Sequence, residues 1–174
     1  SFNHIGPTPG QRDKGARRIH KDFPPLVSKL WDFGPQDYPG SESNDYKDAT
    51  WAIDQLGREH DQPFFIALGF YRPHVPFYAP QRWFGLHPLD KVQLPEVKLD
   101  DRLDLPEIAK TLTFGSTRPA HEWFVKNGKW KNAVQAYLAC VSFMDKQVGR
   151  VLNALDSSAH AKNTIVVLFS DHGF

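Results

Sequence analysis

The strongest constraint on the fold is an unbroken apolar run near the end of the sequence. Residues 165–169 are all apolar and lie between polar turn formers, 163–164 before them and 170–172 after them. Such a run is typical of a strand that is buried on both faces of a sheet. In open α/β sheets, ligands bind in the crevice beyond the carboxyl ends of the strands. We therefore expect Asp171 and His172 to lie where a fold of this class binds ligands.

The side chains of Asp171 and His172 suit a cation site. A carboxylate supplies the oxygen ligands that calcium prefers, whereas an imidazole nitrogen binds zinc or a charged substrate oxygen. The alternative is a structural pair, in which Asp171 caps a following turn and His172 packs beside it. The position after a predicted buried strand favours the functional interpretation.

A second apolar run, residues 64–70, predicts another buried strand that is also followed by polar residues. Arg72 and His74 come directly after it, and Pro73 and Pro76 keep the backbone around them extended. Arginine binds anions by charge-assisted hydrogen bonds, and histidine serves as a donor or general acid. The two polar pairs together favour one shared site. A surface loop with a solvated arginine and a hydrogen-bonded histidine is the alternative.

Apolar residues at helical spacing predict two main helices, at 44–60 and 132–155. Asn44 or Asp45 is the predicted N-cap of the first helix. Each helix precedes one of the apolar runs, and this alternation is typical of an α/β fold. Shorter helices that begin with proline are predicted at 80–86 and 106–111.

The remaining segments contain many prolines and predict loops. Residues 1–45 form a loop-rich N-terminal segment, and residues 78–131 form a long connection with little regular structure. Long loops inside compact domains are usually functional, so we interpret 78–131 as an insertion on the substrate side. At 174 residues the chain is long enough for one domain with a core, and residues 1–174 are predicted to be part of a single domain.

Composition and missing motifs argue against several classes of function. The formal net charge is +1, which does not indicate a nucleic-acid partner. No apolar run approaches the roughly 20 residues of a membrane-spanning helix. The single cysteine, Cys140, excludes an internal disulfide, and its place in a predicted helix indicates a buried apolar residue. Motifs for phosphate-binding loops, dinucleotide binding, serine hydrolases and C-x-x-C redox sites are absent from the sequence.

Three segments, in this order, resemble the sulfatase family. Residues 63–77 resemble the stretch in which a basic residue, a proline and a histidine follow a strand. Residues 136–152 resemble the helix before the second metal motif of that family, and residues 163–173 resemble the motif itself. The resemblance extends from about residue 31 to residue 174. Within the family, the sequence is most similar to the iduronate-2-sulfatase-like branch.

The resemblance implies a fold, a reaction and a cofactor. The fold would be α/β and alkaline-phosphatase-like, with a central, mainly parallel or mixed sheet flanked by helices, and incomplete in this chain. The reaction would be hydrolysis of a sulfate ester on a sulfated small molecule or glycan, dependent on one calcium ion. The nucleophile of the family is a formylglycine made from the first residue of a C/S-x-P/A-x-R motif. The family implies a periplasmic, secreted or lysosomal location and leaves the oligomeric state open.

The same resemblance implies roles for individual residues. Asp171 matches the calcium-binding aspartate, and His172 occupies the next position, a contact to metal or sulfate. His74 matches the sulfate-binding histidine and is the candidate that assists the leaving oxygen, and Arg72 matches a basic substrate-binding position. His4 is similar to the histidine of a G-K-x-x-H element, although a serine stands at the lysine position of that element.

Other family features are missing from the sequence. The paired N-terminal aspartates are absent, and no C/S-x-P/A-x-R motif is present, since Cys140 is followed by Val-Ser-Phe. The resemblance therefore implies an internal fragment that is inactive alone. Two alternatives stay open: a phosphatase or phosphodiesterase of the same superfold, and a non-catalytic anion-binding or structural module.

Overall fold

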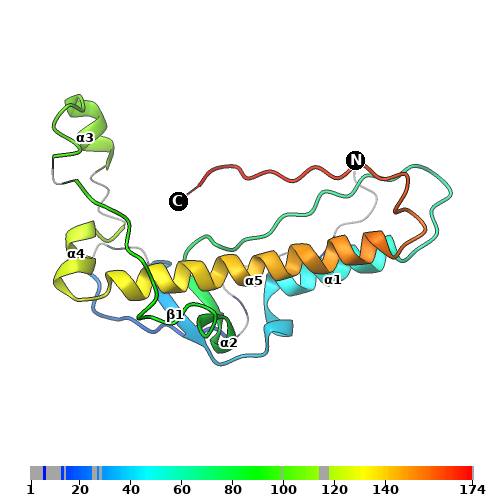
Figure 1. The fold of residues 1–174 in the computed structure, drawn as a ribbon, viewed down its shortest axis with the longest axis horizontal. Coiled ribbons are helices and arrows are strands. Elements are labelled where there is room, and N and C mark those ends of the chain that lie inside the picture. Colours follow the sequence, from blue (N-terminus) through cyan, green and yellow to red (C-terminus); the bar gives the residue numbers. More distant parts are fainter. Residues whose placement is uncertain are drawn as a thin grey trace.

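A computed structural model describes residues 6, 13, 15–24, 27, 29–98, 100–113 and 118–173. Helix α5 is the long axis of the molecule, α1 lies against it, and α3 projects away from the body (Figure 1). None of the helices in the described part of the chain is long and apolar enough to cross a membrane. In chain order the elements are β1 (Phe33–Gln36), the 3-10 helix η1 (Gly40–Glu42), α1 (Asn44–Leu56), β2 (Phe77–Pro80), α2 (Gln81–Phe84), α3 (Glu107–Thr113), α4 (His121–Lys126) and α5 (Trp130–Asp156).

The described residues form a small α/β unit built on one parallel strand pair. Strand β1 pairs with β2, with Phe33 opposite Phe77 and Gln36 opposite Pro80. Helix α1 lies between the two strands in the chain, so β1, α1 and β2 form a parallel crossover unit. The α/β class predicted from the sequence is therefore present, although its strands are not the predicted ones.

The hydrophobic core lies between this strand pair and α5. Both strands contribute aromatic or small side chains, and α5 turns small residues toward them, so that the helix and the sheet approach closely. Cys140 is fully buried in this contact, and burial raises the pKa of its thiol to about 12. Its predicted role as a buried apolar residue is confirmed. The core residues from these elements are Phe33, Phe77, Ala79, Ala133, Ala136, Ala139, Cys140 and Phe143.

A polar clasp joins α1 to α5. The guanidinium of Arg150 donates to the backbone oxygen of Tyr46 at 3.2 Å and to Oγ1 of Thr50 at 2.8 Å. The same group lies 3.7 Å from the centre of the Tyr46 ring, within the range of a cation–π contact. The contact thus combines directional hydrogen bonds with a cation–π interaction.

The helices follow the sequence periodicity closely. The helix predicted at 132–155 is α5, and the helix predicted at 44–60 ends earlier, at Leu56. The predicted cap was wrong: the side chain of Ser43 accepts the hydrogen bond from the Tyr46 amide at 3.1 Å. Asp45 is buried and binds a loop instead. The short helices predicted at 80–86 and 106–111 correspond to α2 and α3, whereas α4 and both strands were not predicted.

The two apolar runs predicted as buried strands are extended, and within the described ranges neither is part of a strand ladder. Among the described residues the only ladder joins β1 to β2, so neither 64–70 nor 163–169 belongs to a sheet. Phe65 is 77% exposed and Ile165 is 91% exposed. Both segments run in the same direction along the same side of α5 (Figure 1). The prediction of burial on both faces was wrong here because no described segment supplies ladder partners to either run.

The core predicts how substitutions in α5 affect stability. Phe143→Ala should lower the free energy of unfolding by roughly 3–5 kcal/mol, because a fully buried aromatic ring leaves a cavity. Leu152→Ala on the same helix is the matched control, since Leu152 is 38% exposed and should cost much less. Urea unfolding followed by circular dichroism measures both. Equal losses in the two variants would contradict the position of the core.

Candidate functional site

The turn at residues 71–76 contains Arg72 and His74, the predicted anion-binding residues. The carboxylate of Asp45, in the first turn of α1, accepts from the backbone amides of Tyr71 at 2.7 Å and Arg72 at 3.2 Å. The His74 amide donates to the Tyr71 carbonyl at 2.9 Å, and the Tyr71 hydroxyl donates to the Val75 carbonyl at 2.8 Å. Burial raises the pKa of Asp45, against the opposing charge of Arg72. A buried carboxyl on α1 therefore fixes the start of the turn.

The guanidinium of Arg72 points into the protein. Its side chain is buried, its Nη2 donates to Asp13 Oδ2 at 2.8 Å, and its Nε donates to the Tyr78 carbonyl at 2.9 Å. Asp13 also accepts from the Tyr38 hydroxyl and from the Asn44 amide. Burial acts to lower the pKa of Arg72, but the charge of Asp13 outweighs it and the pKa is raised. The ion pair between Arg72 and Asp13 thus links the turn to the N-terminal segment.

His74 faces solvent from the same turn. Its Nδ1 lies 2.8 Å from the Val75 carbonyl, and because a carbonyl only accepts, Nδ1 carries the proton. The imidazole also lies against the Tyr71 ring, with 4.8 Å between ring centroids. These contacts orient the imidazole and leave Nε2 as the nitrogen that can meet a ligand.

Asp171 and His172 form an exposed local pair. Their side chains are 87% and 71% exposed, and Nε2 of His172 lies 3.7 Å from Oδ2 of Asp171. The His172 amide donates to Asp171 Oδ1 at 3.0 Å, and the Ser170 hydroxyl donates to the His172 carbonyl at 2.5 Å. Each of these contacts is with a residue nearby in the chain, so both side chains stay open to a partner from elsewhere.

The described residues do not complete a metal site. No group of three or more His, Cys, Asp or Glu side chains is placed to hold an ion within the described ranges. The carboxyl ends of 64–70 and 165–169 both point toward the same end of α5 (Figure 1). One shared site for the residues that follow them stays a prediction. His4, the further histidine singled out from the sequence, lies outside the described residues.

Sequence reasoning missed the buried carboxylates beneath the turn. Asp13 and Asp45 bind Arg72 and the turn backbone, and Asp48 is 7% exposed on the same helix as Asp45. Burial, followed by the charge of Asp45, raises the pKa of Asp48 to about 6. The available signal was the spacing of Asp45 and Asp48 on one face of α1, toward the apolar positions rather than away from them.

Known proteins match nearly the whole chain. A model of the sulfatase family matches residues 19–174. A sulfatase of Formosa agariphila is 41% identical over 193 residues, covering 99% of this chain and 38% of the relative. The mouse iduronate 2-sulfatase is 34% identical over 128 residues, covering 64% of this chain and 22% of the relative. An arylsulfatase of Clostridium perfringens is 29% identical over 152 residues, covering 84% and 29%. The chain therefore spans well under half the length of these relatives.

The contrast between Arg72 and His74 predicts opposite effects on stability. Arg72→Met should lower the free energy of unfolding by roughly 3–5 kcal/mol, because it leaves Asp13 buried without its partner. His74→Ala should change it by no more than about 0.5 kcal/mol, because the imidazole is exposed. Urea unfolding of both variants measures the difference. An unchanged free energy of unfolding in Arg72→Met would mean that the guanidinium is not part of a buried ion pair.

Proposed function

Because the chain belongs to the sulfatase family, we propose that it forms part of a catalytic domain that hydrolyses sulfate esters. The observation that carries this proposal is the family match over residues 19–174, which includes both polar turns. The geometry supports it at two points. His74 stands on a turn that is fixed by Asp45, and Asp171 presents an open carboxylate at the end of an extended apolar segment.

The proposed substrate is a sulfated sugar or glycan. The relatives named iduronate 2-sulfatase are 34% and 32% identical to this chain, and the two named arylsulfatase are 29% and 24% identical. The names of both groups support a sulfate ester as the reacting group. The higher identity to the iduronate 2-sulfatases favours a sugar. A secreted, periplasmic or lysosomal location accords with such a substrate.

His74 is proposed to bind the sulfate group and to protonate the leaving oxygen. Hydrolysis breaks the bond between sulfur and the alcohol oxygen, and the departing alkoxide needs a proton. The Val75 carbonyl holds Nδ1, so a protonated imidazole presents the Nε2 proton outward. Its transfer to the alcohol oxygen as the bond breaks releases a neutral alcohol.

Asp171 and His172 are proposed as ligands on the metal side of the site. The exposed carboxylate of Asp171 fits calcium, which prefers about 6–8 oxygen ligands, and so supplies only part of the required set. His172 is proposed to contact the metal or a sulfate oxygen. A bound calcium ion would supply positive charge to the sulfate oxygens. The remaining ligands and the formylglycine nucleophile are proposed to belong to a longer polypeptide.

Arg72 contributes to the proposed site through its buried contacts. Its ion pair with Asp13 and its bond to the Tyr78 carbonyl hold the turn that carries His74. A direct contact between Arg72 and sulfate, as expected from the sequence, stays a prediction.

The two extended apolar runs fit a larger sheet. We place 64–70 and 165–169 as strands in the central, mainly parallel or mixed sheet of an alkaline-phosphatase-like domain, with α1 and α5 among its flanking helices. The half-buried side of 64–70 alternates with an exposed side, as expected of a strand that already has helices against one face. Residues 1–174 would then be part of a single domain, with 78–131 on the substrate side.

Substitutions in the longer polypeptide test the catalytic assignment. His74→Ala should lower kcat with a sulfated sugar by about a hundredfold or more, because a general acid contributes roughly 10²–10⁴-fold. Asp171→Asn should raise the calcium concentration needed for half-maximal activity. Asp54→Asn is the matched control for Asp171→Asn, since Asp54 is exposed and lies on α1, outside the proposed site. Unchanged kcat in His74→Ala, at normal stability, would contradict its role.

Hydrogen exchange tests the proposed sheet. The amides of 66–69 and 165–169 should exchange rapidly in the 174-residue chain and slowly in the longer polypeptide, where ladder partners protect them. The amides of α5 serve as the control, because their hydrogen bonds are within the helix in both forms. Rapid exchange of both segments in the longer polypeptide would contradict their assignment as strands.

A further inference from the structure

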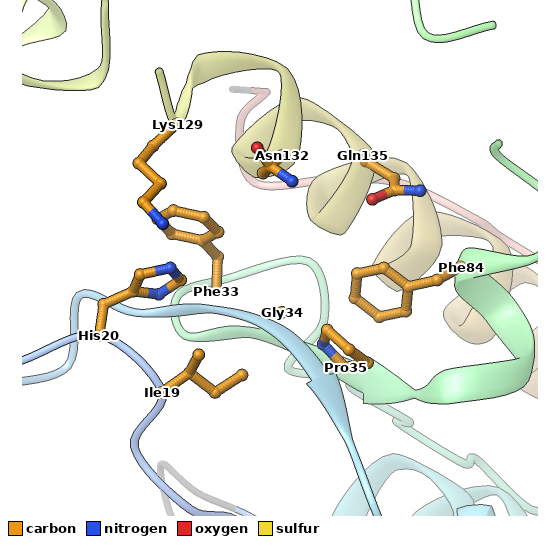
Figure 2. Close-up of a pocket in the computed structure, with 9 residues that line it drawn as sticks. All are labelled: Ile19, His20, Phe33, Gly34, Pro35, Phe84, Lys129, Asn132 and Gln135. Carbon is orange, nitrogen blue, oxygen red and sulfur yellow. The ribbon is translucent and has the colours of Figure 1, made fainter. Parts of the chain in front are cut away.

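A cavity lies between β1 and the first turns of α5, and none of the residues proposed for sulfate hydrolysis lines it (Figure 2). Its volume is about 190 Å³. One water molecule occupies about 30 Å³ in the liquid, so the space holds roughly six waters or a ring-sized ligand. The proposed function does not use this cavity.

The walls of the cavity are largely apolar. Phe33 and Phe84 are 2% and 5% exposed and present aromatic rings to the cavity. Ile19 and Pro35 complete the apolar side (Figure 2). Gly34 has a φ of +129°, and a Cβ there would lie 2.7 Å from Cδ1 of Ile19. Glycine therefore lets the segment with Ile19 approach the strand and close this wall.

The buried carboxylate of Asp32 fixes His20 at the edge of the cavity. Burial acts to raise the pKa of Asp32, but hydrogen bonds from His20, Tyr78 and the backbone outweigh it and lower the pKa. The ionised carboxylate only accepts, so Nδ1 of His20, 2.9 Å away, is the donor. The imidazole also stacks on Phe33, with 4.1 Å between ring centroids. Nε2 is left as the ring nitrogen that the cavity can use.

The other polar groups of the cavity come from α5 and the residue before it. The ammonium group of Lys129 is directed to the side on which His20 lies, and the carboxamide of Asn132 points into the space (Figure 2). Among the described residues, neither side chain has a hydrogen bond or ion pair, whereas Gln135 donates to the His87 carbonyl at 2.7 Å. Within that part of the chain no carboxylate lines the cavity.

We propose that this cavity binds a small ligand that carries a carboxylate or sulfate group on a sugar-sized ring. Lys129 would bind the anionic group by a charge-assisted hydrogen bond. Nε2 of His20 would do the same in the doubly protonated imidazolium, because in the neutral ring the proton is on Nδ1 and Nε2 only accepts. The face of the ring would lie against Phe33 and Phe84, and Asn132 would bind a ring hydroxyl. A cation is disfavoured because the charged group on the cavity wall, Lys129, is positive.

Histidine-selective NMR of the protein tests the proposal with three probes: glucuronate, glucose 6-sulfate and neutral glucose. At least one anionic probe should shift the His20 resonance saturably, with glucose about tenfold weaker or more, since it lacks the charge-assisted contacts. His20→Gln assigns the resonance. The tighter anionic probe identifies the group as carboxylate or sulfate.

Matched lysine variants distinguish specific binding of the anion in the cavity from non-specific electrostatic attraction to the protein surface. Lys129→Gln should weaken the anionic probe by about tenfold, whereas Lys126→Gln, an exposed lysine of α4 outside the cavity, should leave its affinity unchanged. Equal effects of the two variants would overturn the proposal. So would equal affinity for glucose, or no saturable shift with either anionic probe. His74→Ala should leave the His20 titration intact, so failure here is distinguishable from failure of the proposed sulfatase function.

Discussion

The carboxylate of Asp32 is fully buried, and the arrangement of the strand pair depends on how its charge is satisfied. It accepts from the amides of Ile19, His20 and Phe33 and from the hydroxyl of Tyr78. These donors come from the N-terminal segment, β1 and β2. A buried charge without partners is strongly destabilising, so the three segments must meet in this geometry or the carboxylate must leave the core. One side chain thus couples the strand pair to the wall of the cavity.

A second network of buried charges lies beneath the turn at 71–76, and it too joins segments that are distant in the sequence. Asp13 and Asp45 satisfy the side chain and the backbone of Arg72, and Tyr38 and Asn44 complete the shell of Asp13. Because these groups are buried, they hold the turn in one conformation. The backbone of His74 is therefore fixed, although its side chain is exposed. The proposed catalytic group is therefore positioned by the buried residues beneath its turn.

The sequence predicts the features that depend on local pattern and fails for those that depend on distant partners. Helix α5 follows from its apolar spacing alone. The strands β1 and β2 have four residues each and contain proline, so neither has a recognisable periodicity, and their pairing relies on Asp32 and α5. The sequence also showed no sign of the ion pair that Arg72 makes in the core. Its partner Asp13 lies 59 residues earlier, and no local pattern connects the two.

The two apolar runs show how the fold and the proposed site depend on each other. Each run carries polar site residues directly after its carboxyl end, and each is extended without ladder partners in the described residues. Pairing such a segment fixes its backbone and hence the direction in which the next residues leave it. The turn after 64–70 is already fixed by Asp45, whereas the pair after 163–169 has local contacts alone. Strands inserted beside these runs would bury exposed apolar side chains and orient Asp171 in the same step. Completing the sheet would therefore also provide the free energy that assembles the metal side of the site. The position of Asp171 should become fixed together with the sheet and not before it.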